Sequence, residues 1–132
     1  MENSIVILRV GKNAQTNSNQ SVATSYFKAL QEKADNGERF ADGTLKAYQA
    51  WYYSACQGEI VWDNLWEKEV HDFVATMREA GVKSIIYTEK STALMGNLHA
   101  FVSEGCEISG LVRIEKGEGI WASKTQGIRI RI

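Results

Sequence analysis

The sequence has little of several features that would identify a function directly. Its 132 residues include two cysteines and two histidines, and the formal net charge is −1 at pH 7. Nonspecific nucleic-acid binders are usually strongly basic and proteins that mimic DNA strongly acidic, so the balance argues against both classes. We expect no general nucleic-acid partner, although a local charged patch stays open.

Long apolar runs are also absent. No stretch reaches the roughly 18 apolar residues of a membrane-spanning helix, and the first apolar run, Ile5 to Leu8, follows Glu2 rather than a basic leader. We therefore expect a cytoplasmic protein without a membrane partner. At 44% apolar, the chain can bury a core without disulfides or metals.

Cysteine and histidine chemistry is weakly indicated. Cys56 and Cys106 form no CxxC pattern and lie beside apolar positions, which is typical of buried free thiols. Thiol chemistry with His99 is the alternative, but no motif surrounds either cysteine. His71 follows Glu67 by four residues, yet no second histidine completes a zinc motif.

Other catalytic and cofactor motifs are missing as well. Three glutamates are candidate acid–base groups, but no paired spacing distinguishes them from solvated charges: Glu67, Glu69 and Glu89. The pair Gly11-Lys12 lacks the glycine spacing of a phosphate-binding loop. We expect no catalytic residue, no metal and no cofactor.

The stretch from Trp66 to Ile114 is the best-patterned part of the chain. Apolar residues recur every three or four positions from Trp62 to Ala80, which predicts a helix with Trp66 on its buried face. Asp63 is placed to cap this helix, and Gly81 to end it.

A strand, a helix and a strand follow. The unbroken apolar run within 82–88 predicts a strand covered on both faces. Ser91 or Thr92 can cap the next helix, Gly105 can end it, and 108–114 predicts a second strand. This spacing is that of a βαβ unit at 83–114, in which we expect the two strands to be parallel and adjacent.

Three segments carry a resemblance to a known family: REAGV, STALMGNLHAF and GCEISGLVRI. The chain resembles an uncharacterised family of small Gram-positive bacterial proteins, often carried on phages, plasmids and integrated elements. The likeness covers roughly residues 26–114, without the tail after Lys116. It implies a fold and a setting, and no catalytic residue.

The N-terminal third predicts a strand, a loop and two helices. Residues 5–10 are β-like, and 11–20 predict a mobile polar loop. Helices are expected from Ser21 to about Ala34 and from about Asp42 to Cys56. The second helix has four aromatic residues that cannot all point one way, which favours an interface, with simple filling of the core as the alternative: Tyr48, Trp51, Tyr52 and Tyr53.

The C-terminal tail, 116–132, predicts a hairpin, with strands at 120–123 and 128–132 joined by a turn at 124–127. Its last strand is a candidate edge for a homodimer. Four arginines could form one basic surface for an anion or RNA, or act as ordinary edge charges: Arg9, Arg113, Arg129 and Arg131.

The turn between the central strand and the next helix is a candidate ligand site. In α/β sheets, ligands collect at the carboxyl ends of strands, and the free amides of a helix start attract anions. The residues that could bind a small phosphorylated or carboxylated ligand are Thr88, Lys90, Ser91 and Thr92. The alternative is a capped turn without a ligand.

Together these features predict a single α+β domain over residues 1–132. We expect a mixed sheet of about four or five strands, with about four helices mainly on one face. For function we expect a non-enzymatic accessory or regulatory protein that binds another macromolecule, such as a mobile-element modulator of defence. The alternative is a small-ligand or nucleotide-binding protein that uses the turn at 88–92.

Overall fold

A five-stranded mixed sheet with four α-helices mainly on one face forms the protein, as predicted. The computed structural model describes residues 5–10, 18–54, 59–116 and 123–132, and the side chains of 23–54, 59–114 and 126–132. The elements are β1 (Ile5–Val10), α1 (Ser18–Asp35), α2 (Asp42–Tyr53), β2 (Val61–Trp62), a 3₁₀ turn η1 (Glu67–Glu69), α3 (Val70–Glu79), β3 (Ser84–Tyr87), α4 (Ala93–Ser103), β4 (Glu107–Lys116) and β5 (Ser123–Arg131).

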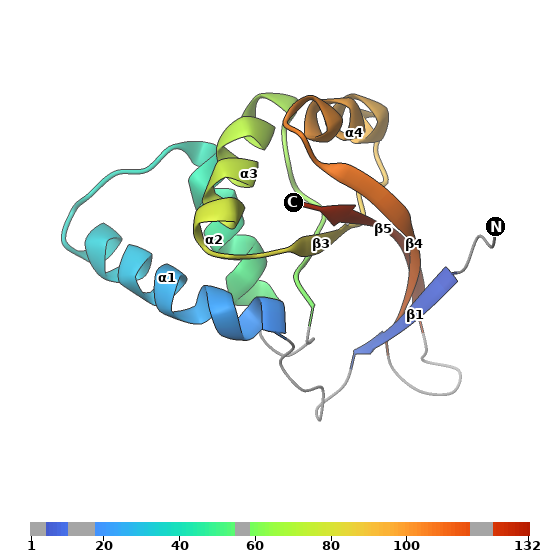
Figure 1. The fold of residues 1–132 in the computed structure, drawn as a ribbon, viewed down its shortest axis with the longest axis horizontal. Coiled ribbons are helices and arrows are strands. Elements are labelled where there is room, and N and C mark those ends of the chain that lie inside the picture. Colours follow the sequence, from blue (N-terminus) through green and yellow to red (C-terminus); the bar gives the residue numbers. More distant parts are fainter. Residues whose placement is uncertain (1–4, 11–17, 55–58, 117–122) are drawn as a thin grey trace.

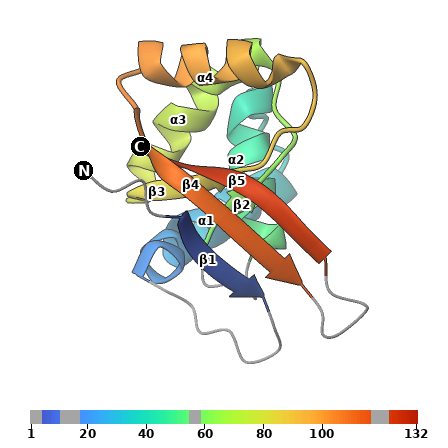
Figure 2. The same ribbon diagram turned by 90° about the vertical axis from the view of Figure 1, so that its right-hand side faces the viewer.

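The helices divide into two groups around the sheet. Helices α1, α2 and α3 lie together on one side, and α4 lies across the end of the sheet (Figure 1). The turned view shows α4 above the long strands β4 and β5, with β1 beside β4 (Figure 2). The sheet order is β1-β4-β5-β3-β2.

The last strand of the chain lies at the centre of this sheet. β5 pairs antiparallel with β3 on one side and with β4 on the other. The two strands of the predicted βαβ unit are therefore parallel to each other, as expected. The expectation that they are adjacent is wrong, because β5 lies between them, as in a split βαβ unit.

The tail also differs from its prediction. The expected turn at 124–127 is part of β5, and the hairpin forms between β4 and β5 rather than within the tail. β5 is thus no free edge for a homodimer. The expected strand at 120–123 and the turn before it lie largely outside the described residues, as does most of the polar loop at 11–20.

Gly127 lets β5 fit against β3. A Cβ atom at this position would lie 2.6 Å from Cγ2 of Ile86 and 3.0 Å from Cγ2 of Thr88, so a larger residue would push the strands apart. Ile128, Ile130 and Ile132 all pack on the same core cluster, so isoleucines and arginines alternate along the end of the chain as predicted. Ile85 and Ile86 of β3 are both fully buried, which confirms a strand covered on both faces.

Several helix boundaries move from their predicted positions. α1 begins at Ser18, inside the predicted loop, and α2 ends at Tyr53. The predicted helix from Trp62 is wrong in its first turns, because Trp62 belongs to β2 and the α-helix starts only at Val70. Trp66 precedes the 3₁₀ turn and is 66% exposed, which corrects its predicted burial.

A close helix contact depends on Gly43 in the first turn of α2. A Cβ atom there would lie 2.3 Å from the carbonyl oxygen of Glu69 and 2.8 Å from the backbone nitrogen of Phe73. Backbone atoms cannot move aside as a flexible side chain can. The absence of a side chain at Gly43 therefore sets how near α2 lies to α3.

The short strand β2 is an outer strand of the sheet, and a serine closes its free side. The hydroxyl of Ser54 accepts a hydrogen bond from the Val61 amide at 2.9 Å and donates one to the Val61 carbonyl at 3.0 Å. Ile60 and Trp62, on either side, direct their carbonyls to β3. Ser54 thus takes the place of a neighbouring strand at Val61.

We expect Gly43→Ala to destabilise the fold by about 1–3 kcal/mol, because the added methyl group collides with backbone atoms of η1 and α3. Urea denaturation followed by circular dichroism measures this. Gly96→Ala in α4 is the matched control, since its methyl group would meet only the flexible carboxylate of Glu67, at 3.3 Å. Equal stability of the two variants would contradict the close helix contact.

We expect Ser54→Ala to cost about 1–3 kcal/mol, because the partly buried amide and carbonyl of Val61 lose their partner. Hydrogen exchange should show faster exchange of the Val61 amide than in the wild type. An unchanged exchange rate in Ser54→Ala would show that another group protects the strand.

Candidate functional site

Two of the hollows on the described surface contain residues that the sequence pointed to, and the two differ in chemistry. The first lies beside α2 and has a volume of about 400 Å³. The second lies between α4 and the sheet and has a volume of about 460 Å³. Both volumes are in the range of small binding sites.

The first hollow is lined by uncharged residues of α1 and α2, which we call the aromatic face: Gln31, Leu45, Tyr48, Gln49, Tyr52 and Tyr53. Tyr52 is 55% exposed and Tyr53 is 68% exposed, so these two predicted interface residues are on the surface. Leu45, Tyr48 and Tyr52 are spaced three and four positions apart, which places them along one side of α2. The aromatic face is therefore a continuous apolar strip rather than scattered rings.

Ring contacts join the aromatic face to the core. Tyr48 stacks on Tyr52 with ring centroids 6.0 Å apart, and Tyr52 meets the edge of Tyr53 at 5.3 Å. Tyr53 in turn stacks on Trp62 at 6.5 Å, with the planes 12° apart. Such neighbours restrict the rotation of the exposed rings, so less conformational entropy is lost when a partner binds.

Trp51 does not belong to this surface, which corrects the predicted interface. Its ring is 8% exposed and stacks on Phe27 of α1, with centroids 5.4 Å apart. For Trp51, core filling is the correct alternative.

Burial raises the pKa of the neighbouring Tyr48 phenol above its usual value, so this hydroxyl stays protonated at neutral pH.

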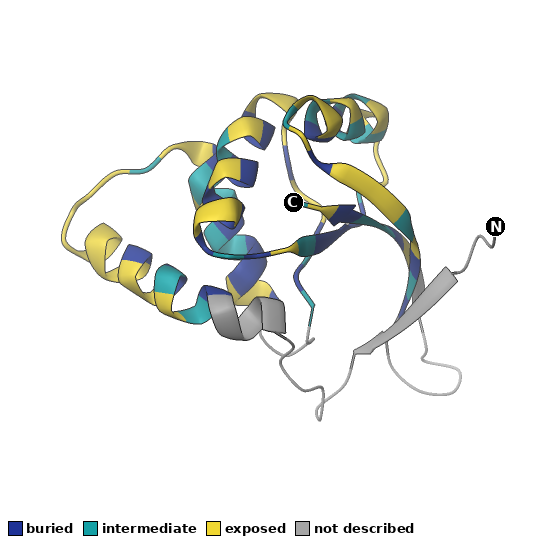
Figure 3. Ribbon diagram, in the orientation of Figure 1, coloured by how far each residue is buried: buried dark blue, intermediate teal, exposed yellow. Residues whose placement is uncertain are grey.

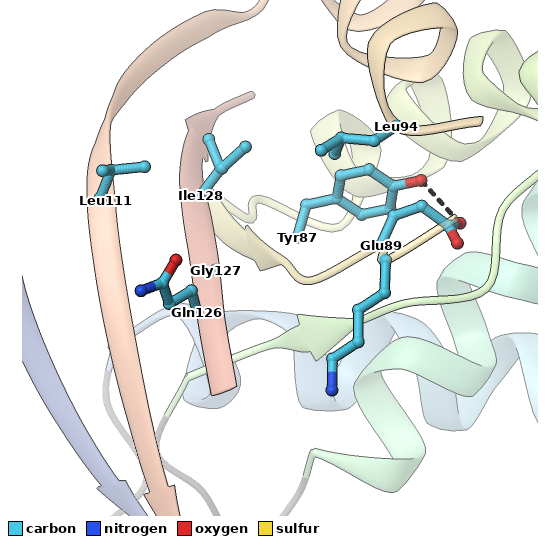
Figure 4. Close-up of a pocket in the computed structure, with 8 residues that line it drawn as sticks. Tyr87, Glu89, Leu94, Leu111, Gln126, Gly127 and Ile128 are labelled. Carbon is cyan, nitrogen blue, oxygen red and sulfur yellow. Dashed lines mark hydrogen bonds between the residues drawn. The ribbon is translucent and has the colours of Figure 1, made fainter. Parts of the chain in front are cut away.

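The second hollow, which we call the Tyr87 cavity, lies where β3 ends and α4 begins (Figure 4). Tyr87 and Glu89 line one side, and residues of β4 and β5 line the other. The described residues that line it are Tyr87, Glu89, Lys90, Leu94, Leu111, Gln126, Gly127 and Ile128. Its position at the carboxyl end of a strand is the one predicted for a ligand.

A buried hydrogen-bond chain orders this cavity. Asn97 Nδ2 donates to the Tyr87 hydroxyl at 2.6 Å, and that hydroxyl donates to Glu89 Oε1 at 3.1 Å. Asn97 also donates to the carbonyl of Leu65 at 2.9 Å. Burial raises the pKa of Tyr87 far above its usual value, so the phenol stays a hydrogen-bond donor at neutral pH.

The predicted anion site at 88–92 has a carboxylate at its centre. Glu89 Oε2 accepts a hydrogen bond from the Ser91 amide at 3.3 Å, and the Ser91 hydroxyl accepts one from the Ala93 amide at 3.2 Å. Ser91 is therefore a cap, as predicted, whereas Thr92 makes no capping bond. Thr88 is buried and bonds to the carbonyl of Trp62. Of the four predicted ligand residues, only Lys90 lines the cavity.

The predicted basic surface does not form as one patch. Arg113 lies opposite Gln126, while Arg129 lies opposite Ile86, so strand alternation places the two arginines on opposite faces. Arg129 is paired with Glu59 at 3.3 Å, and Arg131 with Glu107 at 3.6 Å. The side chain of Arg9 lies outside the described residues. Because β5 is the central strand, Arg129 and Arg131 also do not act as charges that protect a sheet edge.

Cys106, the described candidate for thiol chemistry, has the environment of a structural residue. Cys106 is a buried free thiol, as expected, and burial raises its pKa, which makes it a poor nucleophile. Cys56 lies outside the described residues. The described part contains no group of three or more His, Cys, Asp or Glu residues able to hold a metal, and no helix long and apolar enough to cross a membrane.

Two polar residues near these sites are buried, which was not predicted from the sequence. Glu69 is 6% exposed, accepts a hydrogen bond from the Trp66 amide at 2.8 Å and lies 3.7 Å from Lys46. Asn97 is fully buried. Asn97 falls between apolar residues Leu94 and Phe101 on one side of α4, and this spacing could have revealed it.

The fold and its two hollows define a class: a small α+β domain with a split βαβ unit and open, partly apolar surfaces. A family model described as "Domain of unknown function (DUF7698)" matches residues 44–132, so the chain belongs to that family. Searches of curated proteins and of solved structures found no match. The matched range includes the tail and begins within α2, unlike the range 26–114 of the predicted resemblance.

His71 is paired with Glu104 rather than with Glu67. Its Nδ1 lies 2.7 Å from Glu104 Oε1, and this hydrogen bond, together with the charge of Glu104, raises the pKa of His71 above 6.5. A raised folded-state pKa contributes stability that is complete below the unfolded value and is lost as pH rises through the folded value.

We therefore expect Glu104→Gln to lower the pKa of His71, measured by NMR titration of the imidazole. Asp72→Asn is the control and should lower it less, since Asp72 contributes less than Glu104 to the raised pKa. The loss of thermal stability in Glu104→Gln should be larger on the acid side of neutrality than at alkaline pH. A pH-independent loss would contradict the charged pair.

Proposed function

We propose that the protein is a non-enzymatic accessory or regulatory protein that binds another protein through the aromatic face. The proposal rests on the exposure of Tyr52 and Tyr53. Their rings contact each other, and the Tyr53 ring stacks on Trp62 of the core. Exposed tyrosines of this kind are enriched in protein interfaces and cost little entropy to order. The cytoplasm of a Gram-positive host, with a gene on a mobile element, is the setting that we propose from the resemblance.

The lining of the aromatic face supports a protein partner over nucleic acid. Its described lining residues include no lysine or arginine, and their polar groups are amides and phenols. Nucleic-acid binding draws most of its affinity from positive charge against phosphates. Burial of two tyrosines at the centre of an interface supplies binding energy of the size measured for dominant contacts.

We expect the double variant Tyr52→Ala, Tyr53→Ala to bind its protein partner about tenfold or more weakly, because these are the two most exposed aromatic rings of the face. Tagged wild type and variants are used to capture partners from a Gram-positive lysate, with and without nuclease, and retained proteins are quantified. Folding should be unchanged, since both side chains are largely exposed.

The matched control is Trp66→Ala, which removes a similarly exposed aromatic ring that does not line the aromatic face. It should retain the partner. Loss of the partner in Trp66→Ala but not in the tyrosine variant would assign the interface to another surface, and loss only after nuclease treatment would indicate a nucleic-acid bridge.

A further inference from the structure

We propose that the Tyr87 cavity binds a small, uncharged, planar ligand of the chemical class of a nucleoside. The cavity lies between α4 and the sheet, whereas the aromatic face lies on α1 and α2, so this proposal does not depend on the one above. It also differs from a phosphate site at the start of a helix.

The shape of the cavity favours a flat ring. The phenol ring of Tyr87 lies on one side, and the aliphatic side chains of Leu111 and Ile128 lie on the other (Figure 4). Leu94 lies beside the Tyr87 ring. Tyr87 is only 1% exposed, so the apolar surface open to one face of an aromatic heterocycle comes from Leu111, which is 54% exposed, and the partly exposed Ile128. The polar edge of the heterocycle is left to be bonded by other residues.

The charges of the lining favour an uncharged ligand. Among the described lining residues, Glu89 supplies one carboxylate and Lys90 one ammonium group, and these formal charges cancel. Glu89 also accepts a hydrogen bond from the Ser91 amide near the start of α4, where a phosphate would otherwise be attracted. A phosphate beside this carboxylate would be repelled.

The remaining polar groups match the edge of a nucleobase. The Gln126 amide both donates and accepts hydrogen bonds, the Glu89 carboxylate accepts them, and the Lys90 ammonium donates. Bases present donors and acceptors side by side along one edge. The volume of about 460 Å³ is small for a binding site, which suits one ring system and its sugar.

The surface around the cavity leaves an entry for such a ligand. Leu111 is 54% exposed although it lies in the middle of a sheet strand opposite Ile128. Where β4 begins, next to α4, the strand is coloured as exposed (Figure 3). A ligand stacked on Leu111 would cover apolar surface that α4 leaves open.

The test is an NMR titration of the full chain with guanosine, adenosine, cytidine and uridine, and with inorganic phosphate as a separate probe. At least one nucleoside should give saturable shifts at the amides of Tyr87, Gly127 and Ile128. Its 5′-monophosphate should bind no more tightly than the nucleoside. Inorganic phosphate alone should leave these amides unchanged.

Leu111→Glu should weaken nucleoside binding by about tenfold or more, because it replaces an apolar wall with a second carboxylate. The matched control is Val102→Glu, which makes the same change at a residue of equal exposure, 54%, outside the cavity. It should bind as the wild type does. Gln126→Leu should bind several-fold more weakly, since the edge contacts are lost.

The proposal is overturned if none of the four nucleosides gives saturable shifts, or if Leu111→Glu binds as tightly as Val102→Glu. It is also overturned if phosphate alone shifts the cavity amides. The tyrosine variant of the aromatic face should bind the nucleoside normally, so a failed nucleoside titration says nothing against protein binding by the aromatic face.

Discussion

The antiparallel pairing of β5 with both β3 and β4 is the constraint on which the rest of the structure depends. Without β5, the sheet would consist of two separate pairs, β1 with β4 and β2 with β3. The strand fits only because Gly127 has no side chain to meet Ile86. The same strand supplies Gln126, Gly127 and Ile128 to the Tyr87 cavity, so the sheet and the cavity are completed together.

Periodicity predicted the elements well and their arrangement less well. Apolar spacing identified the four helices and the strands at 5–10, 84–87 and 107–116, because these patterns depend on local burial. The two-residue strand β2 is too short for any period, and Trp62 there satisfied a helical pattern by coincidence. The insertion of β5 between two earlier strands depends on pairing across the whole chain, which no local pattern reports.

The candidate sites were predicted in part for the same reason. Composition indicated that some of the aromatic residues of α2 are exposed, yet the choice of Trp51 for the core depends on Phe27 of α1, which approaches only in the folded chain. The turn at 88–92 was correctly identified as the end of a strand beneath a helix. The local patterns around Leu111 and Gln126 do not show that these residues lie beside this turn. They do so only because β5 pairs with β4 and places both residues at the cavity.

The hydroxyl of Ser54 makes the two sides of the sheet unequal. It occupies the outward-facing backbone groups of Val61 in β2, whereas on the opposite side the outer strand is β1, paired on its inner side with β4. A sheet that could extend at both sides could add copies without limit and form a fibre. With these groups occupied, a strand of another copy could pair with β2 at Val61 only after both hydrogen bonds to Ser54 are broken.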